Sequence, residues 1–293
     1  MKLMTVSLIV LVAALTPLAA YAGLGWIERR QVYQFDTQEV DPAWLGLDGV
    51  RAVDVQNADG GRLIVWFAAP APGQPVIFYL HGNAGDLANR AQRIAIFRAW
   101  GYGVIMPSYR GSSGSAGRPG QRAITADVRQ LWQQRGALLA EAGAGAEAGA
   151  ASQAPVIVYG ESLGSGVAVA GLLASPAAQA DPPAALVLEA PFTSIPAVAR
   201  ALAPGLALLN PVMQERWDSL ANVAHVTMPL MVLHGDRDPL IPFAQGRQLF
   251  EAAPSADKRF LPVAGAGHND LWRPVVIDSL RRFIDTRGQV GAP

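Results

Sequence analysis

Cysteine is absent from this 293-residue sequence, and lysine is nearly absent. Without cysteine the chain forms no disulfide bond, thiolate metal site or thiol nucleophile, and it has no cysteine that could carry an N-terminal lipid. The two lysines, Lys2 and Lys258, leave almost no candidate for catalytic amine chemistry. Nearly all of the positive charge therefore belongs to arginine.

An excess of charge of either sign is also lacking. The 23 basic and 23 acidic residues give a formal net charge of zero, and the absence of a basic run argues against a nucleic-acid partner. The four histidines (His81, His225, His234 and His268) are scattered without the spacing of metal ligands, so no metal cofactor is implied. The glycine loop at Gly160 has no lysine for a phosphate, which disfavours nucleotide binding.

The N-terminus has the three parts of a secretory signal. A charged start at Lys2 is followed by an apolar run, Leu3–Leu15, and a small-x-small end, Ala20–Ala22. We expect residues 1–25 to be a signal peptide cut after Ala22, or an uncleaved membrane anchor, because the apolar character continues to Ile27. A buried helix is the weaker alternative, since the run has no polar face. The protein is therefore expected to be exported (periplasmic or secreted) or membrane-anchored.

Strand and helix patterns alternate after residue 50. Residues 26–49 are expected to be a linker, residues 50–287 one domain and residues 288–293 a tail. Two short strands around a glycine-rich turn predict an antiparallel hairpin, and later strands separated by helical patterns predict a mostly parallel sheet covered by helices on both faces. The predicted strands are 50–55, 63–67, 76–80, 104–106, 156–159, 186–188, 230–233 and 258–263, and the predicted helices include 87–100, one with Ile124, Val128, Leu131 and Trp132 in its core stripe, and 269–286.

Two segments interrupt this alternation. Residues 136–153 are rich in alanine and glycine, which predicts a low-complexity surface insertion with a frayed helix. Residues 192–226 follow Pro191 and contain three more prolines, Pro196, Pro204 and Pro211, together with an apolar string, Leu202–Leu209. This segment is interpreted either as a small helical cap that contributes an apolar substrate surface or as an ordinary crossover with packing helices, and the pattern favours neither.

The segment from Val156 to Gly166 has the order of a nucleophile elbow. A buried-strand pattern runs into Gly160-x-Ser162-x-Gly164, and an apolar helix pattern of small residues follows. Such a turn holds its serine in strained backbone geometry with the hydroxyl exposed, and a side chain at either glycine would collide with neighbouring backbone. Ser162 is therefore the candidate nucleophile.

A serine hydroxyl needs a base, and the base needs an acid that fixes its tautomer. His268, in a glycine loop between the last strand and the last helix, is the candidate base. Asp238, after the 230–233 strand, is the preferred acid, while Asp236 is expected to bond amides of its own turn and Glu189 is a third option. His234 is expected to support that loop, and His225 to be structural.

Two backbone N–H groups are needed to bind an oxyanion. One is predicted to be that of Leu163, at a helix N-terminus, and the other that of Asn83, or else Ala84, in the glycine-rich loop after the 76–80 strand. His81 is expected to shape this loop. Tyr109 and Arg110 are expected to shape the site without a catalytic step.

Together these motifs resemble the α/β-hydrolase superfamily from about Val50 to Thr286. The features that carry the resemblance are His81–Gly85, the Tyr109–Ser115 loop, the Gly160–Gly164 elbow, His234–Asp238 and Gly267-His268, in the superfamily's order of serine, aspartate and histidine. His81–Gly85 and Gly265–Asp270 are similar to a branch with an N-terminal membrane segment and little cap, some of whose members are esterases or acyl-protein thioesterases. The insertion at 136–153 departs from the family pattern.

The resemblance implies a serine hydrolase that cleaves a carboxylic ester or thioester of a small-molecule or acylated substrate through an acyl-enzyme, without a cofactor. A peptidase or amidase on the same triad is the first alternative, because the pattern of residues is the same. A non-catalytic binding protein of this fold is the second. Haloalkane or epoxide hydrolysis is disfavoured, since those members carry aspartate where Ser162 stands.

Overall fold

The computed structural model describes residues 19–142 and 153–287. Most of the expected signal peptide or anchor (1–25), most of the low-complexity part of the insertion (136–153) and nearly all of the tail (288–293) lie outside the described residues. Within the two described ranges, no helix has the length and apolar character needed to cross a membrane.

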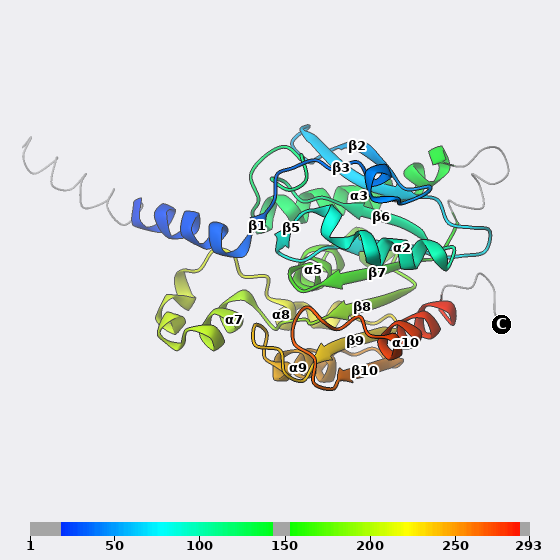
Figure 1. Ribbon diagram of the computed structural model, residues 1–293. Coiled ribbons are helices and arrows are strands. Elements are labelled where there is room, and N and C mark those ends of the chain that lie inside the picture. Colours follow the sequence, from blue (N-terminus) through cyan, green and yellow to red (C-terminus); the bar gives the residue numbers. More distant parts are fainter. Residues whose placement is uncertain (1–18, 143–152, 288–293) are drawn as a thin grey trace, which may run out of the picture.

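An eight-stranded sheet forms the centre of the molecule, in the order β10-β9-β8-β7-β4-β6-β3-β2 (Figure 1). The six strands from β10 to β6 run parallel, and β3 and β2 are antiparallel to their neighbours. Both the mostly parallel sheet and the antiparallel hairpin that the sequence predicted are therefore confirmed. The strands of this sheet are β2 (Arg51–Gln56), β3 (Arg62–Ala68), β4 (Val76–Leu80), β6 (Gly103–Pro107), β7 (Val156–Glu161), β8 (Ala185–Glu189), β9 (Leu230–Gly235) and β10 (Lys258–Val263).

Helices cover both faces of the sheet, because successive side chains of each buried strand point to opposite faces. Phe78 of β4 packs towards α3 (Gln121–Ala142), and Ile77 belongs to the core under α2 (Ala91–Ala99) and α10 (Pro274–Asp285). The remaining helices are α5 (Leu163–Gly166), which continues into a π-helical turn Val167–Leu173, α6 (Pro176–Ala180), α7 (Ile195–Leu202), α8 (Ser219–Asn222) and α9 (Phe243–Ala252), with 3-10 turns at Pro42–Leu45, Leu87–Arg90, Pro204–Val212 and Val223–His225.

Residues 26–49 are not the simple linker that the sequence predicted. Residues 19–32 are helical, and β1 (Gln34–Phe35) pairs in parallel with β5 (Ala84–Gly85), in the loop after β4. The N–H of Gln34 donates to the carbonyl of Asn83 at 2.8 Å. A two-residue strand whose partner is a distant loop leaves no periodic pattern in the sequence, so the prediction of a linker was wrong for this segment.

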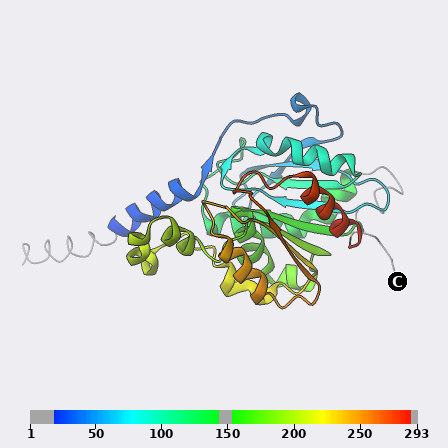
Figure 2. The same cartoon turned by 60° about the horizontal axis from the view of Figure 1, so that its bottom comes forward.

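Two further boundaries differ from expectation. The last helix begins at Pro274 rather than near 269, since proline suits the first turn and the preceding residues form the loop that carries His268. Helix α3 continues through Gly136 to Ala142, so the first residues of the expected insertion are helical. Residues 192–226 form several short helical pieces, of which α7 and Pro204–Val212 extend beyond the end of the sheet (Figure 2).

We predict that the sheet core tolerates loss of volume poorly. Leu186 of β8 is fully buried, whereas Leu208 is 88% exposed. Leu186→Ala should lower the free energy of unfolding by about 2–5 kcal/mol, because it removes buried methyl groups and leaves a cavity. The matched variant Leu208→Ala should change it by less than about 0.5 kcal/mol in the same urea titration. Equal losses at the two positions would contradict this core.

Candidate active site

Ser162 lies at the turn between β7 and α5, in a backbone conformation that L-residues seldom adopt (φ 50°, ψ −112°). A Cβ at Gly160 would stand 2.7 Å from the carbonyl oxygen of Gly164, and a Cβ at Gly164 would overlap the carbonyl of Leu80. The turn therefore closes only with glycine at both positions, for the steric reason that the sequence suggested. It leaves the Ser162 hydroxyl at the carboxyl edge of the sheet.

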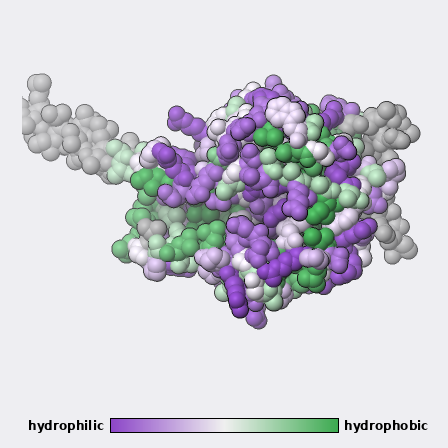
Figure 3. Space-filling model, viewed as in Figure 1, coloured by the Kyte–Doolittle hydropathy of each residue, from purple (hydrophilic) through white to green (hydrophobic). Residues whose placement is uncertain are grey.

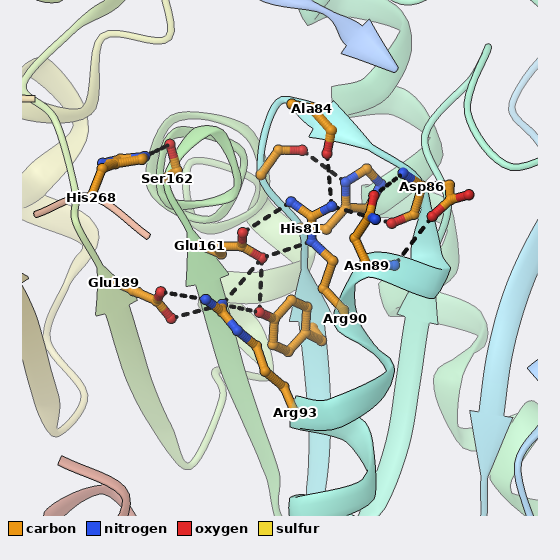
Figure 4. A network of polar contacts seen from close by, with 12 residues as sticks. His81, Ala84, Asp86, Asn89, Arg90, Arg93, Glu161, Ser162, Glu189 and His268 are labelled. Carbon is orange, nitrogen blue, oxygen red and sulfur yellow. Dashed lines mark hydrogen bonds and ion pairs between the residues drawn. The ribbon is translucent and has the colours of Figure 1, made fainter. Parts of the chain in front are cut away.

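Ser162, His268 and Asp238 lie in one hydrogen-bonded chain. His268 Nε2 is 3.0 Å from Ser162 Oγ, and His268 Nδ1 is 2.7 Å from Asp238 Oδ2 (Figure 4 shows the serine and the imidazole). The three side chains come from the loops after β7, β10 and β9, whose carboxyl ends meet at the same edge. In this geometry Nδ1–H donates to the carboxylate, which leaves Nε2 free to accept the serine proton.

The side chain of Asp238 is fully buried and is held as an anion. Its Oδ1 accepts the N–H groups of Leu240 at 2.8 Å and Ile241 at 2.9 Å. Burial alone raises the pKa of Asp238, but hydrogen bonds from His234, His268 and Ile241 outweigh it and hold the pKa well below its usual range. His234 supports the same loop, as expected, because its Nε2–H donates to the carbonyl of Ile241 at 3.0 Å.

The two alternative acids are engaged elsewhere. Asp236 accepts the N–H of Gly265 at 2.7 Å, so it ties its turn to the neighbouring loop rather than to its own amides. Glu189 forms an ion pair with Arg93 at 2.9 Å and bonds with Trp272, away from His268. His225 lies in the Val223–His225 turn, half-buried, and takes no part in this chain of hydrogen bonds.

The backbone N–H groups of Leu163 and Asn83 are the candidates for binding an oxyanion. Leu163 and Asn83 line the same cavity as Ser162, and the N–H of neither donates a hydrogen bond to any described residue. Leu163 is the first residue of a helical run, where the helix dipole also favours negative charge. The carbonyl of Asn83 accepts a hydrogen bond from the N–H of Gln34. Strand β1 thereby fixes the orientation of the peptide between Asn83 and Ala84, and so helps to hold the loop in place.

His81 keeps this loop in shape as a neutral ring. Burial, and secondarily the charge of Arg90, lower its pKa to about 3. Nδ1–H donates to the carbonyl of Gly82 at 2.8 Å, and the ring stacks on Tyr109 with 4.0 Å between centroids. Arg110 instead pairs with Asp127 at 2.6 Å, which stabilises its loop outside the cavity.

The cavity in front of Ser162 has a volume of about 370 Å³ and is mostly apolar. Its far wall belongs to α7, which favours the cap interpretation of residues 192–226 over an ordinary crossover. No sequence pattern indicated that the helix 19–32 and β1 would line it too. The lining residues are Gln31, Val32, Gln34, Asn83, Ser162, Leu163, Phe192, Ile195, Val198, Ala199, Leu202, Leu240 and Ile241.

A family model described as "Serine aminopeptidase, S33" matches residues 71–221 and 217–271, which is more than half of the chain. This range includes Ser162, Asp238 and His268. The chain belongs to the serine aminopeptidase S33 family.

Relatives of this S33 member include an uncharacterized protein of Mycobacterium tuberculosis, 33% identical over 271 residues, 90% of this chain and 89% of the relative. The lysophosphatidylserine lipase ABHD12 of Rattus norvegicus is 33% identical over 253 residues, 78% of this chain and 60% of the lipase. The esterase Pf2001 of Pyrococcus furiosus has the same fold, with a TM-score of 0.64, 17% identity, and 87% of this chain and 98% of that chain covered. The α/β-hydrolase fold is thus confirmed, and the chain is a serine hydrolase related to esterases and lipases.

A charged network lies on the opposite side of the elbow from the serine in this S33 hydrolase (Figure 4). Glu161 directly precedes Ser162 and receives two hydrogen bonds from Arg90, at 2.9 and 3.1 Å. Arg90 also donates to the carbonyl of Ala84 at 2.7 Å. Burial raises the pKa of Glu161, but Arg90 and then Arg93 outweigh it and hold the pKa below its usual range. Arg90 therefore ties the loop of Asn83 to the elbow.

No motif in the sequence pointed to this network. A glutamate at the end of a strand buried on both faces requires a cationic partner. Its place at the end of such a strand could therefore have indicated a buried ion pair. The sequence could not have told which arginine pairs with Glu161, because Arg90 and Arg93 lie one helical turn apart and face the same strand ends.

We predict that Arg90 positions the oxyanion loop. Arg90→Met should lower kcat for ester hydrolysis by about 10–100-fold with a smaller change in KM, because a misplaced N–H donor is felt in the transition state. Arg90→Lys should recover part of that loss. The measurement is steady-state kinetics, normalised to the folded fraction.

Arg93→Met is the matched control. Arg93 also contacts Glu161, at 3.4 Å, and it pairs with Glu189 rather than with the carbonyl of Ala84. Each variant breaks a buried ion pair and should lose stability, by about 3–5 kcal/mol. Equal losses of kcat in the two variants would contradict a positioning role for Arg90.

Proposed function

We propose that this protein is a serine hydrolase that cleaves a carboxylic ester or thioester through an acyl-enzyme. The observation that carries the proposal is the continuous chain of hydrogen bonds from Asp238 through His268 to Ser162, at the edge of an apolar cavity. The relatives named as lipases and esterases support it.

In the first step Ser162 Oγ attacks the acyl carbon while His268 Nε2 takes the hydroxyl proton. The carbonyl oxygen becomes an oxyanion, which the N–H groups of Leu163 and Asn83 stabilise. His268 then returns the proton to the departing alkoxide or thiolate, and the acyl group stays on Ser162. Water, deprotonated by His268, releases the acid and regenerates the serine. Throughout, Asp238 remains ionised and stabilises the imidazolium.

We propose an acyl chain as the group that enters the cavity. Val198, Leu202 and Phe192 give its wall no charge and few hydrogen-bonding groups, which suits a hydrocarbon chain. The lysophosphatidylserine lipases among the relatives act, by name, on an acylated lipid. An acylated lipid or a similar long-chain ester is therefore the proposed substrate class.

Hydrolysis of an amide is the second candidate, because the family description is that of an aminopeptidase. An aminopeptidase must bind the ammonium group of a free N-terminus, and a carboxylate in the pocket is the group suited to do so. The described residues that line the cavity include Gln31, Gln34 and Asn83 but no Asp or Glu. This lining favours esters over peptides.

A substrate comparison tests the proposal. The chain should hydrolyse p-nitrophenyl esters, with activity rising from acetyl towards longer acyl groups, and should turn over aminoacyl p-nitroanilides far more slowly. Ser162→Ala should lower kcat on the esters by on the order of 10⁴-fold or more. Asp238→Asn should lower it by about 10⁴-fold, because the imidazole then takes the wrong tautomer.

Three outcomes would contradict it. Preference for the anilides would establish the aminopeptidase alternative. Ester turnover unchanged in Ser162→Ala would remove the serine from the reaction. A folded protein that hydrolyses neither class would support the non-catalytic binding protein instead.

We also propose that the chain is exported or held at a membrane by its N-terminal segment, on the basis of Lys2, the Leu3–Leu15 run and Ala20–Ala22. The prediction is that the protein recovered from its native cells begins at Gly23 outside the cytoplasm, or retains Met1 in the membrane fraction. Mass spectrometry of the N-terminal peptide from each cell fraction measures this. An intact Met1 in the soluble cytoplasmic fraction would contradict both forms.

A further inference from the structure

Large exposed apolar side chains gather at one end of the molecule. Seven of the ten such side chains in the described residues belong to two segments, and Figure 3 shows apolar surface at the end where α7 lies in Figure 1. A patch of this kind marks a binding surface more often than a solvent-facing one. We call it the apolar end face; it consists of Tyr21, Trp26, Ile27, Leu202, Leu208, Leu209 and Val212.

The two segments of the apolar end face are held together. Gln214 donates from its backbone N–H to Glu28 at 2.7 Å and from its side chain to the carbonyl of Tyr21 at 2.7 Å. Trp217 Nε1–H donates to the buried Tyr33 hydroxyl at 3.1 Å. Figures 1 and 2 both show the helix 19–32 and the α7 region extending on the same side of the sheet. The face is therefore one surface built from both.

The charges of this face suit a lipid. Residues 19–27 and 197–213 contain a single charged residue, Arg200, and no acid. At the border, the exposed Arg30 lies over the ring of Trp26 at 4.8 Å. Tryptophan and arginine beside an apolar surface are typical of the interface between hydrocarbon and headgroups. The cationic border also complements anionic phospholipids.

The face is continuous with the active-site cavity. Leu202 is 54% exposed on the face and also lines the cavity in front of Ser162. Gln31 and Val32, at the end of the helix 19–32, line the cavity from the other side. An acyl chain that leaves a bilayer at this face thus has an apolar route to Ser162.

The chain that precedes the face has the same character. Residues 1–18 lie outside the described residues, and in residues 1–27 the single charged residue is Lys2. This apolar segment joins the molecule at Ala19, next to the apolar end face. Attachment of that segment to a bilayer would place the exposed Leu202, Leu208 and Leu209 beside the same membrane.

We propose that the apolar end face docks on a lipid bilayer, with Leu208 and its neighbours in the hydrocarbon boundary and the cavity mouth at the membrane surface. Delivery of acyl substrate from the bilayer rests on the proposed hydrolase function, whereas docking itself does not. A protein partner or a second copy of the chain would cover the same leucines without lipid contact, so lipid contact is what the experiment measures.

The natural lack of cysteine makes a site-specific probe direct. Leu208→Cys gives the full chain a single thiol, which is labelled with the fluorophore NBD and reconstituted into phosphatidylcholine–phosphatidylglycerol vesicles with or without doxyl-labelled lipid. The emission should shift to the blue and be quenched by the doxyl groups. Val275→Cys is the matched control, since Val275 is 64% exposed on α10 at the other end of the molecule, and its label should show neither change.

An unquenched label at position 208 would overturn the proposal. A blue shift there without doxyl quenching would show that protein, a second copy or another partner, covers the face, and this too would overturn it. Equal quenching at positions 208 and 275 would mean that the whole surface contacts lipid, so the face would have no special role.

An activity arm separates docking from chemistry. Leu208→Asp should lower hydrolysis of a long-chain acyl ester presented in vesicles by about tenfold or more, because it places a charge where the proposal puts an apolar side chain in the hydrocarbon boundary. Its hydrolysis of a soluble short-chain p-nitrophenyl ester should be unchanged, since Leu208 is not among the cavity residues. Equal losses on both substrates would contradict the proposal. If the parent chain hydrolyses neither ester, the proposed function fails while the fluorescence result still decides the docking face.

Discussion

The turn at Ser162 is the constraint on which the site depends. A serine at φ 50° is strained by about 1–3 kcal/mol, and it persists only where its surroundings fix it. Here the Ser162 N–H donates to the carbonyl of Glu189 at 2.8 Å, and Gly160 packs within contact of Gly164. The strained turn holds the Ser162 hydroxyl at the edge of the sheet, where a residue in relaxed strand or helix geometry would not present it.

Glu161, the last residue of β7, and Ser162, the first residue of the turn after it, have opposite tasks. Ser162 faces the cavity and His268, while Glu161 faces the other way and holds Arg90. Arg90 in turn holds the carbonyl of Ala84, so the loop with the Asn83 N–H, which donates to none of the described residues, is fixed relative to the nucleophile. The charges of Glu161 and Arg90 thus lie on the side of the elbow away from the cavity, and the cavity in front of Ser162 is mostly apolar.

The sequence predicted the sheet and the three polar side chains of the triad geometry because both depend on local patterns. Buried strands are continuous apolar runs, and Ser162 and Asp238 follow two of them, β7 and β9. His268 follows the edge strand β10, and it was found from the glycine loop that carries it. The sequence did not predict β1 or the cavity walls from Gln31 and Val32, since those depend on contacts between distant segments. The choice between cap and crossover also required tertiary structure, because an apolar string packs equally well in either role.

Activation of Ser162 by His268 is the central claim, and a fluorophosphonate probe tests it most directly. The probe phosphonylates a serine only when a neighbouring base removes its proton. After reaction with the folded protein and proteolysis, we expect one modified peptide, that of Ser162, with the modification lost in Ser162→Ala and strongly slowed in His268→Ala. Absence of labelling on the folded chain, or labelling of another residue at the same rate, would contradict it.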